Sequence, residues 1–164
     1  MKPAYIFLVL VLLALISSAS ATQTIQEVMT STAKACPGVG NVVVVQDDAH
    51  IGVTISPGQY ATSSDLSNAV ASLVVFYSKI LQEVPSYQGY LRVGIANRGP
   101  DGKNHIVQIF EAPAQETRAN QDQIVSYANT ILGRGKEQTY QYTVDGYLVT
   151  WPGPDPYDPY GYQR

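Results

Sequence analysis

The stretch YLRVGIANRGPDGKNHIVQIFE, residues 90–111, decides the fold because it holds two strands and the turn between them. Leu91, Val93 and Ile95 alternate with polar or small residues, which is typical of a strand with one buried face. Glycine, proline, aspartate and asparagine gather in the middle, and an apolar strand returns from His105. The stretch therefore predicts an antiparallel β-hairpin.

The segment before this hairpin predicts the central helix of the core. Residues 64–84 carry an apolar stripe at helical spacing that includes Leu73, Tyr77 and Leu81. A threonine and a serine just before the stripe can cap the first turn, and Pro85 ends the helix.

A similar unit stands at the start of the folded region. Residues 24–36 form an amphipathic pattern, with Thr24 and Glu27 placed as a capping box. Two short strands follow at 41–46 and 50–56, joined by a tight turn. We expect a helix followed by a hairpin here too.

A third unit ends the folded region. A helix is expected after Pro113 and as far as Leu132, and the stretch YQYTVDGYLVTW follows it at 140–151. Asp145-Gly146 is the preferred pair for a two-residue type I′ turn. That turn pairs Val144 with Tyr147, Tyr142 with Val149 and Tyr140 with Trp151, all on one face. We expect this aromatic face to form part of the core, with a sugar-stacking platform as the alternative.

The order of these elements predicts the fold class. Helix and hairpin alternate three times, which favours an α+β, two-layer domain over residues 22–151. Its three helix-plus-β-hairpin units would form one mainly antiparallel sheet of about six strands with the helices on one face. We expect Gln141, Thr143, Tyr90 and Arg92 on the opposite, open face. A polar open sheet can bind a partner or a second copy through its edge.

The N-terminus predicts export. Residues 1–21 combine Lys2, a 12-residue apolar run and a small-x-small pattern at Ala19-Ser20-Ala21, which together indicate a signal peptide. The apolar run is shorter than the ~20 residues that cross a bilayer, although a retained anchor is the alternative. We expect a secreted or extracytoplasmic (cell envelope) protein with no transmembrane segment in its mature chain.

Composition narrows the function further. Thirteen acidic residues exceed ten basic ones, which are scattered, so a nucleic-acid partner is not expected. Cys36 is the single cysteine and has no internal disulfide partner. It is either a buried, inert residue or a link to another chain, so a homo-oligomer could form through Cys36 or through a sheet edge.

The sequence lacks the common nucleophile, zinc-protease, nucleotide-binding and calcium-loop motifs. Carboxylates and imidazoles do gather in the predicted turns. If the three turns lie at one end of the sheet, a divalent metal could bind there. The candidate ligands are Asp47, Asp48, His50, Asp101 and His105, with Asp145 in the third turn.

The C-terminal segment, residues 152–164, is rich in proline and tyrosine, and we expect it to be a disordered tail. Its candidate binding residues are Tyr157, Tyr160 and Tyr162, with a merely solvated tail as the alternative.

The leading hypothesis is a non-enzymatic binding or assembly module of the cell envelope or extracellular space, without a cofactor. Its partner would be an unknown protein or envelope polymer. The alternative is a metal-dependent or carboxylate-based enzyme with its site at the turns.

Overall fold

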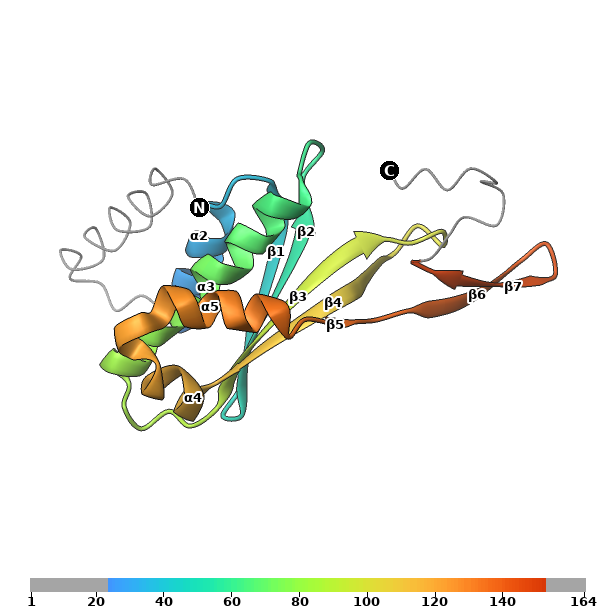
Figure 1. The fold of residues 1–164 in the computed structure, drawn as a ribbon. Coiled ribbons are helices and arrows are strands. Elements are labelled where there is room, and N and C mark those ends of the chain that lie inside the picture. The colour runs from blue at the N-terminus through green and yellow to red at the C-terminus, as the bar shows by residue number, and fades with distance from the viewer. Residues whose placement is uncertain (1–23, 153–164) are drawn as a thin grey trace.

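The computed structural model describes residues 24–152 (Figure 1). The predicted signal peptide, and the proposed tail with Tyr157, Tyr160 and Tyr162, lie outside the described residues. The helices are α2 (Ile25–Lys34), α3 (Ser63–Glu83), α4 (Ala114–Ala119), the 3-10 turn η1 (Gln121–Gln123) and α5 (Ile124–Gly133). The strands are β1 (Val39–Gln46), β2 (His50–Pro57), β3 (Tyr90–Arg98), β4 (Asn104–Pro113), β5 (Lys136–Glu137), β6 (Tyr140–Val144) and β7 (Tyr147–Trp151).

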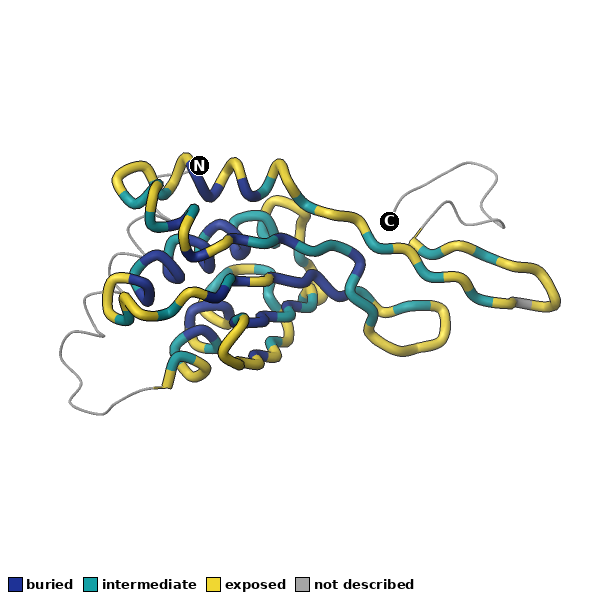
Figure 2. Tube along the Cα trace, turned by 90° about the horizontal axis from the view of Figure 1, so that it is seen from below, coloured by how far each residue is buried: buried dark blue, intermediate teal, exposed yellow. Residues whose placement is uncertain are grey.

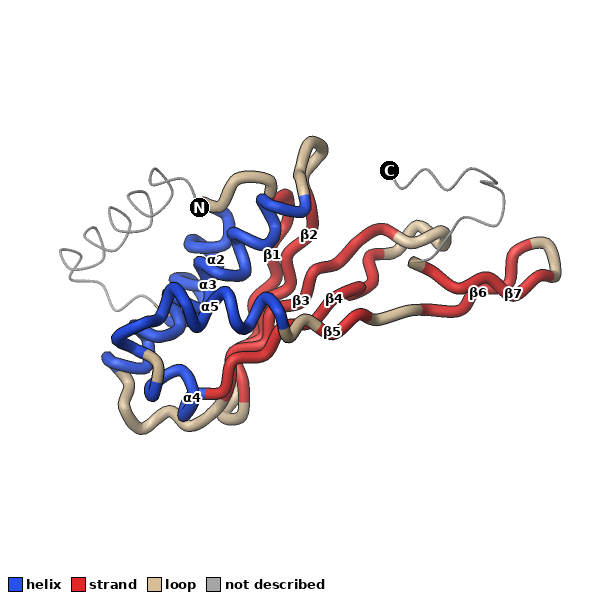
Figure 3. The backbone as a smooth tube through the Cα atoms, viewed as in Figure 1, coloured by secondary structure: helices blue, strands red, loops and turns tan. Residues whose placement is uncertain are grey.

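Five strands form one sheet in the order β1-β2-β3-β4-β5. All neighbours are antiparallel except β2 and β3, which are parallel because α3 connects them and returns the chain to the same end. The helices lie together on one side of this sheet (Figure 3). The α+β class with a mainly antiparallel sheet and helices on one face is confirmed.

The core lies between the helices and that face of the sheet. Ile51, Val53 and Ile55 of β2 are at most 1% exposed, and they belong to the same buried cluster as the apolar stripe of α3. Both capping boxes that begin the long helices are formed, at Thr24 of α2 and Thr62 of α3. Each box satisfies backbone N–H groups that would otherwise lack partners at the helix start.

The single helix predicted after Pro113 is wrong: the segment forms α4, then η1, then α5. Asn120 separates the first two, and its Nδ2 donates a hydrogen bond of 2.8 Å to the carbonyl oxygen of Glu116. Such a side-chain bond competes with the helical hydrogen bonds and ends α4. The buried residues Tyr127 and Ala128 lie on α5, which packs on α3.

The prediction of one sheet of about six strands is also wrong. β6 and β7 form a separate two-stranded sheet. After β5 pairs with β4, the chain leaves the edge of β4 and the hairpin projects beyond the β3–β4 turn (Figure 1). The perpendicular view shows the same projection, mostly exposed or half-buried (Figure 2). We call this hairpin, residues 140–151, the arm.

The arm itself has the predicted turn and register. Asp145 and Gly146 have φ values of 50° and 85°, the left-handed conformation that a type I′ turn needs. The three predicted cross-strand pairs are all present, from Val144 with Tyr147 to Tyr140 with Trp151. The local sequence therefore determined the hairpin, although it did not determine where the hairpin packs.

Candidate functional site

The face of the five-stranded sheet opposite the helices, here called the open face, carries an ordered row of polar side chains. His50 and Tyr90 are cross-strand partners on β2 and β3, and their rings stack with centroids 5.6 Å apart. The guanidinium of Arg92 lies 5.3 Å from the centre of the Tyr90 ring. Arg92 is in turn the partner of Glu111 on β4, and Lys136 of β5 reaches the same carboxylate. These five residues form the open-face row.

Glu111 holds the positive end of the row together. Its Oε1 accepts hydrogen bonds of 3.0 and 2.8 Å from Nε and Nη2 of Arg92, and its Oε2 lies 3.0 Å from Nζ of Lys136. These contacts, first from Arg92 and then from Lys136, lower the pKa of the Glu111 carboxyl. Two cations share one carboxylate, so this end of the row has a surplus positive charge.

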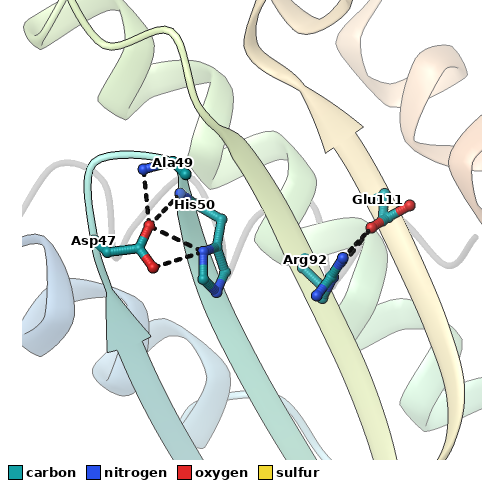
Figure 4. Close-up of polar contacts among 5 residues, drawn as sticks. All are labelled: Asp47, Ala49, His50, Arg92 and Glu111. Carbon is teal, nitrogen blue, oxygen red and sulfur yellow. Dashed lines mark hydrogen bonds and ion pairs between the residues drawn. The ribbon is translucent and has the colours of Figure 1, made fainter.

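The other end of the row is fixed by Asp47, in the turn before β2 (Figure 4). Its Oδ1 accepts from the backbone N–H groups of Ala49 and His50, both at 2.8 Å, and from Nδ1 of His50 at 3.0 Å. The backbone bonds are the main cause of the lowered pKa of Asp47. The carboxylate thus orders both the turn and the imidazole. Among the described residues, no serine or cysteine side chain hydrogen-bonds to that ring.

Exposed apolar residues extend the open face at its β1 edge. Val43 and Val45 are 53% and 55% exposed, and they pair with Thr54 and Gly52 of β2. A Cβ at Gly52 would lie 2.9 Å from Cγ2 of Val45 and 3.5 Å from the ring of His50. Because Gly52 has no side chain, Val45 and His50 can both pack above it. The exposed valines of β1 are therefore continuous with the open-face row.

A second aspartate–histidine pair orders the β3–β4 turn. Nε2 of His105 lies 2.9 Å from Oδ2 of Asp101, whose Oδ1 accepts from the backbone N–H of Lys103 at 3.0 Å. The His105 ring also contacts the arm: its centroid is 4.7 Å from that of Tyr140 and 6.2 Å from that of Trp151. This histidine helps to attach the arm to the sheet.

The two aspartate–histidine pairs are not brought together. His50 is level with Tyr90 at the start of β3, whereas His105 is level with Asn97 near its end. The separation of seven residues along β3 is about 23 Å, and ligands of one ion must converge to ~2 Å of it. The expectation that the hairpin turns share one end is wrong because β2 and β3 are parallel.

Asp48 lies in the β1–β2 turn, at the end of the sheet away from the Asp101–His105 pair. Asp145 lies at the tip of the arm, away from the Asp47–His50 pair. Within residues 24–152, no three histidine, cysteine, aspartate or glutamate side chains are grouped so that they could hold a metal ion.

The aromatic face of the arm is only partly a core surface. Tyr140, Tyr142 and Trp151 are half-buried against His105 and the β3–β4 turn, and the Tyr140 hydroxyl donates to the carbonyl oxygen of Ile106 at 2.7 Å. Farther along, Tyr147 is 71% exposed. The expectation that the aromatic face forms part of the core is wrong for the tip, because the arm extends past the strands that cover its base.

Cys36 is half-buried beside the core, and its Sγ donates to the carbonyl oxygen of Thr32 at 3.3 Å. Burial raises the pKa of the thiol, although a hydrogen bond with Ser72 lowers it in part.

Because the thiolate is the reactive form of cysteine, we expect Cys36 to oxidise slowly. On non-reducing electrophoresis the protein should migrate as a monomer, and so should a Cys36→Ala variant. A dimer band that disappears with reductant and with Cys36→Ala would contradict this.

Sequence reasoning placed Tyr90 and Arg92 on the open face but missed Glu111 and Lys136. Opposite charges in the two strands of one hairpin are a signal for Glu111. No such signal exists for Lys136, since β5 has only two residues.

No described helix has the length and apolar character that a membrane span requires. No family model, no curated protein and no solved structure matches the chain.

Proposed function

We propose that the chain is an exported, non-enzymatic binding or assembly module that takes its partner on the open face of the sheet. The observation that carries the proposal is the open-face row, in which side chains from four strands fix one another on the face without helices. Side chains ordered before binding lose less conformational entropy when a partner arrives, and affinity rises accordingly.

The chemistry of the face indicates the class of partner. Val43 and Val45 offer exposed apolar area at one side, and Arg92 and Lys136 supply more positive charge than Glu111 neutralises. Arginine and aromatic side chains are enriched at the residues that dominate binding energy. The surface therefore favours an extended partner with an apolar part and a carboxylate, either an acidic protein segment or an acidic envelope polymer.

The enzyme alternative has less support. The carboxylates and histidines proposed as its site divide between two ends of the sheet, with each histidine oriented by its own turn aspartate. In both turns the aspartate also accepts a backbone N–H, which accounts for its presence without catalysis.

The test is retention of the purified chain, residues 22–164, on two separate probes: the protein fraction and the insoluble polymer fraction of the source organism's envelope. Arg92→Ala should reduce retention on one probe at least tenfold, because arginines at interface centres commonly contribute that much. Added salt should reduce it as well, since the attraction is electrostatic.

Lys34→Ala is the matched control, because it removes an exposed cation from α2 on the opposite side of the domain. Its retention should stay within twofold of the parent chain. Equal retention of the parent and the Arg92→Ala variant on both probes would refute binding by the open face.

A further inference from the structure

Within residues 24–152, no strand lies beside the backbone groups on the outer edge of β7. In a hairpin with a two-residue turn the flanking pair, here Val144 and Tyr147, is hydrogen-bonded, and every second pair after it is too. Val149 and Trp151 therefore bond to β6. The N–H and C=O groups of Leu148 and Thr150 point the other way, where the two-stranded sheet has no further strand among the described residues.

Within the part of the chain that the structure describes, this edge lacks the features that usually prevent pairing. Proteins protect exposed edges with charged side chains, with proline or with a covering element. β7 has no charged residue and no proline within YLVTW, and its Leu148 side chain is 68% exposed. The outer part of the arm extends beyond the body in both views, so another strand could approach it there (Figure 1, Figure 2).

The edge of the large sheet at β1 is different. The carbonyl oxygen of Val44 in the middle of that strand accepts a hydrogen bond of 2.7 Å from Nε2 of Gln26. Gln26 belongs to α2, which packs along β1. A strand that paired with β1 would have to displace this side chain. Of these two edges, the one at β7 is left uncovered by the described residues.

We infer that β7 pairs with β7 of a second copy, antiparallel and centred on Val149. In this register Leu148 lies opposite Thr150 of the second copy, and Tyr147 lies opposite its Trp151. The outward backbone groups would form about four hydrogen bonds, two at each Leu148–Thr150 pair. The two hairpins would then become one four-stranded sheet.

A second copy is favoured because the strand complements itself. It presents no charge that would oppose a like charge, and both aromatic pairs are of the kind that stabilises neighbouring strands. The contact is small, well below the ~1,200 Å² of standard interfaces, so we expect a weak dimer with a dissociation constant of about 10 to 500 µM. The inference goes beyond the proposed function, because it does not involve the open face.

Sedimentation equilibrium of residues 22–164 between 5 µM and 1 mM tests it. The parent chain should show a monomer–dimer equilibrium. The double substitution Leu148→Lys with Thr150→Lys places like charges opposite each other at both hydrogen-bonded pairs, and it should weaken the dimer at least tenfold. Leu148→Lys with Thr150→Glu places opposite charges there instead, and it should restore the dimer to within threefold.

Gln141→Lys with Thr143→Lys is the matched control. It adds the same charges with the same spacing to the same face, but on β6, one strand away from the proposed contact. This variant and Arg92→Ala should both dimerise as the parent chain does. A parent chain that is monomeric up to 1 mM would overturn the inference, and so would a dimer that the Lys/Lys pair leaves unchanged. A Lys/Glu variant that stays monomeric would overturn the antiparallel register.

Discussion

Replacing Gly89 with alanine is expected to destabilise the domain by about 3 kcal/mol, because the added methyl group overlaps atoms that cannot move away. An ideal Cβ at this position would lie 2.5 Å from the backbone oxygen of Ala49 and would also overlap the Tyr87 hydroxyl. The Ala49 oxygen already accepts the backbone N–H of Tyr90 at 3.1 Å. Relieving this overlap would thus require a shift of the β1–β2 turn, which also holds His50 in place.

Gly89 also receives two further contacts, which explains why its backbone cannot shift alone. Its carbonyl oxygen accepts from the Tyr77 hydroxyl at 3.2 Å and from the backbone N–H of Ala114 at 3.0 Å. Gly89 therefore lies in contact with three segments at once: α3, the β1–β2 turn and the start of α4. A shift at this point would reach all three.

Thermal unfolding followed by circular dichroism measures the effect, with a decrease in Tm of roughly 10 °C expected for a domain of this size. Gly133→Ala is the control: it lies at the end of α5 with nothing within 4 Å of its ideal Cβ, and it should be neutral or slightly stabilising. If both variants unfold at the same temperature, the crowding at Gly89 does not affect the stability of the domain.

Arg118→Ala should have the second largest effect, a loss of about 2 to 3 kcal/mol of stability, because hydrogen bonds from a charged donor are worth more than neutral ones. Nη2 of Arg118 donates to the carbonyl oxygens of Pro85 and Tyr87 at 2.9 and 2.7 Å, and it lies 3.4 Å from that of Val84. These carbonyls end α3 and begin the loop that leads into β3. Without the guanidinium they lose their shared donor.

Urea unfolding measures the free energy of unfolding of the Arg118→Ala variant, and Arg134→Ala is the control variant. Arg134 forms an ion pair with Glu116, and the two side chains are 54% and 34% exposed. An exposed pair of this kind contributes about 0 to 1 kcal/mol. Equal losses for the two arginine variants would show that Arg118 is only a surface charge, without a role in holding the loop.

Local features of the sequence were predictable because their physics involves neighbouring residues. Thr24 and Glu27 predict the start of a helix because they exchange capping-box hydrogen bonds across three positions. Asp145-Gly146 predicts a turn because both residues readily adopt the left-handed backbone conformation that it needs. The break at Asn120 was missed, because the apolar pattern continues beyond it while the side-chain bond that ends α4 leaves no periodic signal.

The open-face row depends on local alternation for some of its residues and on long-range strand register for the others. Alternation along β3 correctly placed Tyr90 and Arg92 opposite the core. Glu111 could not be paired with Arg92 by counting from the turn, since a bulge shifts the register between Ile95 and Ala96. One extra residue in a strand moves every later side chain to a different partner.

What the sequence determined by itself was the first two helices, the three hairpins, the exposed and buried sides of the strands in the first two hairpins, and the turn of the arm. These depend on hydrophobic period, caps and backbone preferences within a few residues. Only the tertiary structure decided that β3 lies parallel to β2, and therefore that His50 and His105 stand at opposite ends of the sheet. It alone also directed the arm past the β3–β4 turn, which leaves the outer edge of β7 without a neighbouring strand among the described residues. Both outcomes depend on contacts between segments far apart in the chain, for which a single sequence has no local signal.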